Sequence, residues 1–183
     1  SLREELRKKI EEAKKRIEKL MDDVRKEAEK AKRSNEELLR RLRKLAKETK
    51  RRIEELLERV KDESVKERIR RVLEESDRTL REAEELIRRV NEHDDRILRK
   101  IEEEIKRVLE KLEKVIKDVE RVDDEEKVRR LLKEIEEILR RIEDKVRKLL
   151  KELRDSNRDS KRLVDELMRR DKEVLRRIEE EVK

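Results

Sequence analysis

His93 is the only histidine in the chain, and two carboxylates, Asp94 and Asp95, follow it directly. A histidine beside carboxylates can bind a metal ion or move a proton during catalysis. On a helix, however, three consecutive side chains point in different directions, and position 93 lies about 100° from the centre of the apolar stripe. We therefore predict that His93 lies at the edge of the core or in solvent, without a metal or acid–base role.

Two carboxylates, Asp94 and Asp171, fall on the apolar side of helical segments. Burial there disfavours the charged form and can shift a pKa toward that of a catalytic group. The sequence around them shows no nucleophile, pocket or oxyanion hole. We expect no catalytic residue, no cofactor and no enzyme activity, and we assign both carboxylates to a structural polar network.

The composition predicts a helical protein. Of 183 residues, 62% are charged, and Gly, Pro, Cys and aromatic residues are absent. Ordinary domains carry roughly 25% charge, but here Leu, Ile and Val recur at helical spacing among strong helix formers, which favours order over disorder. Without Cys, disulfides and thiolate metal sites are excluded. Apolar runs are short and no targeting segment is visible, so we expect a soluble protein and assign it no compartment.

The net charge of +7 comes from 60 basic and 53 acidic residues. Positive and negative side chains alternate at three- and four-residue spacing, for example along 58–68. Ion pairs on the helix surfaces should therefore cancel most of the electrostatic field of the charged residues. Basic clusters at 14–16 and 50–52 have no aromatic neighbour that could stack a base. We expect no specific nucleic-acid partner and no association with membranes.

Apolar residues repeat every eighteen residues, which corresponds to five turns of an α-helix. The series in the three parts of the chain are Leu6, Val24, Leu42 and Val60; Val65, Ala83, Ile101 and Val119; and Val128, Val146, Val164 and Val182. The repeat changes phase between 60 and 65 and again between 119 and 128. These phase changes predict two turns and three long, nearly straight helices.

Helix start signals agree with three helices in a single domain, 1–183. The capping pattern, in which a short polar side chain precedes a Glu by three residues, occurs at Ser1 with Glu4, Ser64 with Glu67, and Asp123 with Glu126. We predict helices over about 1–61, 64–121 and 124–183. Because the connections are very short, neighbouring helices must be antiparallel. The predicted fold class is all-α, a long antiparallel three-helix bundle running up, down and up.

Polar residues interrupt the apolar stripe at matching heights, most visibly in the run RDSNRDSKR at 154–162. If the chain folds back near residue 63 and again between residues 123 and 124, residues of the first and third helices whose numbers differ by 122 lie at the same height. These relations bring the polar residues into two layers. The first predicted layer contains Asn35, Asn91, Ser156 and Asn157, with Ser34, Asp94 and Ser160 within about a turn. The second contains Thr49, Ser76 and Asp171, with Thr79 a turn away. A buried polar group without a partner costs roughly 1–3 kcal/mol, so we predict cross-helix hydrogen-bond networks that fix helix register.

The eighteen-residue core repeat, the absence of Gly, Pro and aromatics, the charged surfaces and the discrete polar layers together resemble de novo designed helical bundles with built-in hydrogen-bond networks. Gly is common in the loops of such designs, and this chain departs from them there. The resemblance covers the whole chain and implies a recombinant synthetic scaffold, monomeric, with no natural biochemical function, no cofactor and no required partner.

The alternative is an interaction module that forms a homo-oligomer or binds a partner helix in a groove between two helices. The first helical segment carries Ala13, Ala28, Ala31 and Ala46, and these small side chains permit close approach of another helix.

Overall fold

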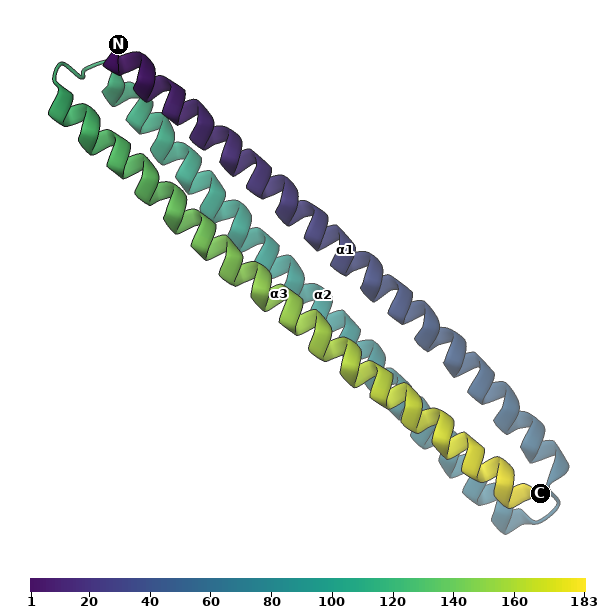
Figure 1. Cartoon of the computed structure of the whole chain (residues 1–183). Helices are drawn as coiled ribbons and strands as arrows, with labels where there is room; N and C mark the ends of the chain where they lie inside the picture. Colours follow the sequence, from purple (N-terminus) through teal and green to yellow (C-terminus); the bar gives the residue numbers. More distant parts are fainter. The chain divides into compact units, whose positions relative to one another are not determined.

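The computed structural model describes all residues, 1–183, and contains three α-helices and no strand. These are α1 (Leu2–Arg59), α2 (Glu63–Val119) and α3 (Glu125–Val182), which Figure 1 shows as uninterrupted ribbons joined by two short connections. The prediction of an all-α three-helix bundle is confirmed. Each predicted helix boundary lies within two residues of the observed one.

The capping prediction is correct for α1 and wrong for α2. The Glu4 amide donates to Ser1 Oγ at 3.3 Å, and the Glu4 carboxylate lies 3.5 Å from the terminal ammonium. At the start of α2 the cap is Asp62 rather than Ser64: Asp62 Oδ1 accepts hydrogen bonds from the Ser64 amide and the Ser64 hydroxyl, both at 2.9 Å. The cap lies earlier because Asp62 is itself a strong capping residue placed directly before the helix.

The capping prediction for α3 is displaced by one residue. The Lys127 amide donates to Asp124 Oδ1 at 2.8 Å, so Asp124 is the cap. Asp123, which the sequence pattern favoured, instead pairs with the Lys127 ammonium at 3.1 Å. Two adjacent aspartates satisfy the same pattern, and the path of the connecting chain decides between them.

The two connections are built without glycine and without any residue of positive φ. In the first, the Val60 amide still donates to the Leu56 carbonyl and the Asp62 carbonyl already accepts from Lys66, so α-helical hydrogen bonds approach the turn from both sides. In the second, the Arg121 and Val122 amides each donate to the carbonyl three residues earlier. These tighter bonds close the last turn of α2 and satisfy carbonyls that a helix end would otherwise leave open.

The chain divides into two compact units, each formed by segments of all three helices. Unit 1 comprises Ser1–Lys30 with Asp94–Arg154, and unit 2 comprises Ala31–His93 with Asp155–Lys183. In both units, partner residues rise along α1 while they fall along α2, so these segments are antiparallel. Partners in α1 and α3 rise together, so those segments are parallel. The expectation of a single domain stays a prediction.

The core of unit 1 is entirely apolar. Its buried side chains are Leu, Ile and Val with one Ala and one Met, and the most deeply buried include Leu6, Ile10, Ile17, Ile101 and Leu112. Each fully buried branched side chain contributes about 1.5–3 kcal/mol relative to an exposed one. Packing of these stripes therefore holds unit 1 together.

The core of unit 2 combines apolar clusters with buried polar side chains. One cluster contains Leu38, Leu42, Leu45, Leu80, Ala83, Ile87, Val164 and Met168, and the other contains Ile53, Leu56, Ile69, Leu175 and Ile178. All five buried polar residues of the chain belong to this unit: Asn35, Thr49, Ser76, Ser160 and Asp171. The candidate site is therefore sought in unit 2.

The observed cap of α3 gives a direct test. Replacement of Asp124 by Ala should lower the free energy of unfolding by about 1 kcal/mol because the Lys127 amide loses its acceptor. Replacement of Asp123 by Ala removes only an exposed ion pair and should change stability less. Chemical denaturation followed by circular dichroism measures both, and a larger loss for the Asp123 variant would show that Asp123 is the cap.

Candidate functional site: two polar layers in unit 2

The first polar layer is centred on Asn35, whose side chain is 4% exposed. Its amide nitrogen donates to Asn91 Oδ1 at 2.8 Å and to Asn157 Oδ1 at 3.1 Å. Both amide protons of one side chain are therefore used on two other helices. This arrangement ties α1, α2 and α3 together at one height of unit 2.

The other residues predicted for this layer take different positions. Ser160 is buried, but its hydroxyl donates to the Asn157 carbonyl at 3.1 Å, so it is satisfied within α3. Ser156 is half-buried and lies outside the hydrogen-bonded group. Asp94 is half-buried and belongs to unit 1. The assignment of Ser34 to the layer is wrong, because Ser34 is exposed: one residue along a helix turns the side chain by about 100°, away from the direction of Asn35.

The second polar layer is centred on Asp171, which is 4% exposed. Its Oδ2 accepts a hydrogen bond from Thr49 Oγ1 at 2.9 Å, and its Oδ1 accepts one from the Ser76 hydroxyl. Thr49 and Ser76 are themselves buried, and Thr79 is half-buried and lies outside this group. One carboxylate of α3 therefore receives a proton donor from each of the other two helices.

The environment of the second layer makes ionisation of Asp171 less favourable than in water. Burial raises the pKa of Asp171 above its ordinary value of 3.8, and the nearby charge of Asp77 acts in the same direction. The hydrogen bonds from Ser76 and Thr49 lower the pKa but do not outweigh burial. Neutral hydroxyls solvate a carboxylate less well than water does, and no Lys or Arg forms an ion pair with it.

The three hydrogen-bonded side chains of the second layer are all buried. Ser76 next to a carboxylate has the residue types of an activated nucleophile, but both groups are buried. The main surface grooves of the chain are lined by other residues. The largest of those in unit 1 has an apolar floor that includes Ile17, Met21 and Ile105.

His93 is half-buried at the end of the α2 segment of unit 2, beside the half-buried Asp94 and the exposed Asp95. No group of three or more His, Cys, Asp or Glu side chains is arranged to hold a metal ion. None of the three helices combines the length and the apolar composition needed to cross a lipid bilayer.

Sequence reasoning missed the ion pairs that cross between helices. In unit 1, Arg16 pairs with Glu143 at 2.6 Å and Glu27 with Arg154 at 2.9 Å, each pair separated by 127 residues. In unit 2, Arg52 and Glu179 repeat the same separation at 3.7 Å. A search for opposite charges at one constant separation would have found this series, because helices packed at fixed register repeat their neighbours.

The edge between α1 and α2 carries a second series. Arg7 with Glu120 (2.7 Å) and Lys14 with Glu113 (3.0 Å) belong to unit 1, and Arg43 with Glu84 (3.1 Å) belongs to unit 2. In every pair the cation lies on α1, and the anion lies on α2 or, for Glu120, directly after the last residue of α2. Most of these side chains are largely exposed, and exposed pairs contribute roughly 0–1 kcal/mol each.

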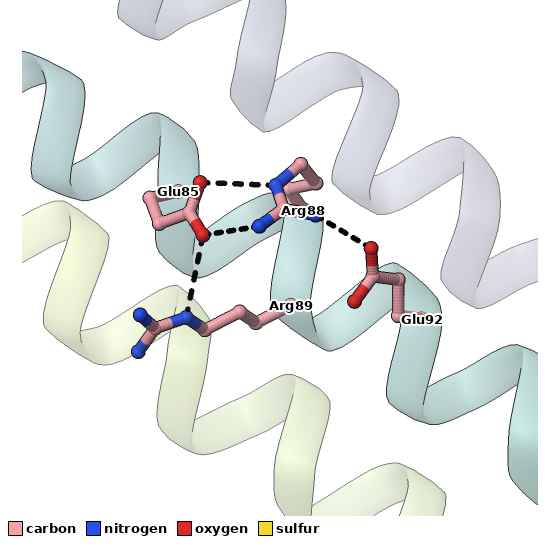
Figure 2. A network of polar contacts seen from close by, with 4 residues as sticks. All are labelled: Glu85, Arg88, Arg89 and Glu92. Carbon is pink, nitrogen blue, oxygen red and sulfur yellow. Dashed lines mark hydrogen bonds and ion pairs between the residues drawn. The ribbon is translucent and has the colours of Figure 1, made fainter.

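The most connected group on the surface of unit 2 lies within α2. Figure 2 shows Arg88 between Glu85 and Glu92, with Arg89 also reaching Glu85. The hydrogen bond from Arg88 is the main reason that the pKa of Glu85 lies below its ordinary value. The members are three and four residues apart on one exposed helix face, which is the surface pairing that the alternating charges predicted.

Comparison of the chain with protein-family models, with curated proteins and with solved structures finds no match.

The raised pKa of Asp171 predicts a pH dependence of a defined sign. The folded chain binds this proton more tightly than the unfolded chain, so the associated stability is complete below about pH 3.8 and is lost as pH rises through the folded pKa. Asp171→Asn keeps a hydrogen-bonding side chain but cannot ionise. We expect the free energy of unfolding of the wild-type chain to fall, relative to that of this variant, as pH rises above about 4.

Urea denaturation of both proteins across the acidic to neutral range measures this difference. Carboxylates with lowered pKa values, such as Glu104 and Glu173, make the free energy of unfolding increase with pH. This contribution is the same in both proteins and cancels in the difference between them. Asp159→Asn, which alters an exposed carboxylate of α3, is the matched control and should keep the wild-type profile. Parallel profiles for the wild type and Asp171→Asn would contradict the prediction.

A second prediction separates the network from its individual members. Asp171→Leu alone leaves the Thr49 and Ser76 hydroxyls without their acceptor, whereas Thr49→Val, Ser76→Ala and Asp171→Leu together remove all three groups. We expect the triple variant to be about 1–3 kcal/mol more stable than the single variant and at least as stable as the wild type. Chemical denaturation gives the order, and a single variant as stable as the triple variant would show that the hydroxyls do not need Asp171.

Proposed function

We propose that this chain is a structural scaffold whose two polar layers fix the register of its helices. The observation that carries the proposal is the pair of donations from Asn35 to Asn91 and Asn157, which joins three helices through one buried amide. The role includes no catalysis, no cofactor and no required partner, and the chain acts as a monomer of 22.7 kDa.

A displaced register would leave several polar groups unpaired. If α1 moved by one turn, four residues, within unit 2, Ala31 or Leu39 would replace Asn35 and could not donate to Asn91 and Asn157. In the second layer, Leu45 or Ile53 would replace Thr49 opposite Asp171. Each orphaned group costs roughly 1–3 kcal/mol, whereas the apolar stripe would still meet an apolar stripe. The polar layers therefore discriminate between registers that hydrophobic packing tolerates.

The ion pairs at the helix edges support the same register more weakly. A shift of one turn in one direction would bring Leu39 opposite Glu84 in place of Arg43 and lose the ion pair, whereas a shift in the other direction would bring Lys47 and keep it. Because exposed pairs contribute roughly 0–1 kcal/mol, their loss is smaller than the loss of a buried layer. The buried amide and carboxylate groups therefore dominate the choice of register.

We further propose that the chain is a designed protein. The strict repeat of the core and the cross-helix hydrogen bonds of the two polar layers support this origin. A synthetic scaffold of this kind resembles designed bundles with hydrogen-bond networks, in which the polar layers serve specificity.

Replacement of Asn35, Asn91 and Asn157 together by Leu tests the proposal. The free energy of unfolding should stay equal or increase, because apolar side chains replace costly buried amides. Register specificity should decrease, seen as more than one set of amide signals in NMR spectra or as mixed masses in light scattering. Leu42→Met, a change of similar volume in the same core, is the control. A single set of signals and a uniform mass of 22.7 kDa for the triple variant would show that the layer does not fix register.

A second candidate function, self-association, is favoured by one exposed leucine. The edge between α2 and α3 carries the ion pair Arg68–Glu181 at 2.6 Å. Eighteen residues further along α2 and eighteen residues back along α3, the same edge carries Leu86 and Leu163 instead. Leu163 is 47% exposed. If this face associates with a second copy, Leu163→Glu should reduce a dimer seen by light scattering, and an unchanged concentration dependence of the mass would reject the face as an interface.

A further inference from the structure

We propose that two copies of this chain exchange α1, so that α1 of one copy packs against α2 and α3 of the second copy and the connection 60–62 opens into continuous helix. The exchanged partner is a second copy of this chain, bound through the contacts that α1 makes within one chain.

The first connection requires little change to become helical. Only Val60, Lys61 and Asp62 separate α1 from α2, and α-helical hydrogen bonds already reach Val60 from one side and Asp62 from the other. No residue here is Gly or Pro, and none has a positive φ that a helix would exclude. The connection is therefore held as a turn by the Asp62 cap and by the packing that follows it, with no residue that prevents helix.

The second connection is held in place by more contacts than the first. It spans five residues, and the Arg3 side chain donates from Nε to the Val122 carbonyl at 2.9 Å. Asp124 caps α3, and Asp123 pairs with Lys127. Opening this connection would break these contacts, whereas opening the first breaks the two hydrogen bonds of the Asp62 cap. The hinge is therefore assigned to the first connection.

The contacts of α1 survive the exchange because none of them depends on the hinge residues. Asn35 and Thr49 would find the same partners, Asn91, Asn157 and Asp171, in another copy. Burial and hydrogen bonding are then equal in the two forms, and the balance depends on the hinge and on protein concentration. Short connections between long elements are the setting in which such exchange competes with a closed monomer.

The charges select the kind of contact that a second copy can make. The cations Arg7, Lys14 and Arg43 lie on the edge of α1 that faces α2. Each pairs with a Glu that lies on α2 or, for the partner of Arg7, directly after the end of α2. Two α1 helices packed through this edge would oppose cation to cation. The edge therefore fits α2 of a second copy and disfavours pairing of α1 with α1.

Two exposed hinge variants test the exchange. Lys61→Gly disfavours a continuous helix by about fourfold per hinge, and because a dimer contains two hinges the dimerisation constant should fall roughly fifteenfold. Asp62→Ala removes the cap of the closed form and introduces the best helix former, so the constant should rise, by about fivefold per hinge. The proteins are unfolded, refolded at increasing concentration and measured by light scattering. The expected order of dimer fraction is Asp62→Ala, then wild type, then Lys61→Gly.

A crosslink identifies the dimer as exchanged. The chain has no Cys, so Arg43→Cys with Glu84→Cys supplies a unique pair on α1 and α2 for a short bis-maleimide. In an exchanged dimer the crosslink joins two chains, which denaturing electrophoresis shows as a covalent dimer. In a dimer formed through the face of Leu163 it stays within one chain, and Leu163→Glu would abolish that dimer. Crosslinks confined to single chains, absence of dimer in Asp62→Ala at every concentration, or the reverse order of the hinge variants would overturn the proposal.

Discussion

A buried amide or carboxylate must find partners inside the protein, and this requirement governs the arrangement of unit 2. Asn35 can use both of its amide protons only when Asn91 and Asn157 stand at the same height, and Asp171 needs the hydroxyls of two other helices. Leucine or valine stripes impose no comparable condition, since one apolar turn packs almost as well as the next. On this basis we propose that the hydrogen bonds, rather than the apolar stripes, determine which alignment of the helices is adopted.

Different interactions act at different levels of this protein. Strong helix formers and closely spaced ion pairs, such as those around Arg88, favour the individual helices. Burial of Leu, Ile and Val drives the helices together. In the proposed function, the polar layers select the register of the helices, and ion pairs at the helix edges add to that selection. The polar layers also have an energetic cost. Two hydroxyls stabilise the ionised form of Asp171 less well than water does, and its pKa is raised.

Much of the fold follows from the sequence because the repeat of eighteen residues is regular. The phase changes located both turns, and the helix boundaries were placed within two residues. The caps of α2 and α3 were misplaced, since Asp62 competes with Ser64 and Asp124 with Asp123, and such choices depend on the backbone path of the turn. In the layers, the offset of 122 separates Asn35 from Asn157 and Thr49 from Asp171, and both pairs are hydrogen-bonded. Height along the bundle does not determine the direction of a side chain, and Ser34 is exposed although it follows the height of Asn35. Nor does height show whether a side chain forms its hydrogen bond within its own helix, as Ser160 does in α3.

All five buried polar side chains lie in unit 2, whereas the core of unit 1 contains only aliphatic side chains and one methionine. The two units therefore differ in the mutational freedom of their interiors. An aliphatic interior accepts repacking by residues of similar volume, and a truncated leucine there leaves a dry void suited to a small apolar guest such as benzene or xenon. A cavity created by truncating a side chain beside the polar layers of unit 2 would instead admit water to the hydrogen-bonding groups. A binding site for an apolar guest would therefore be engineered in unit 1.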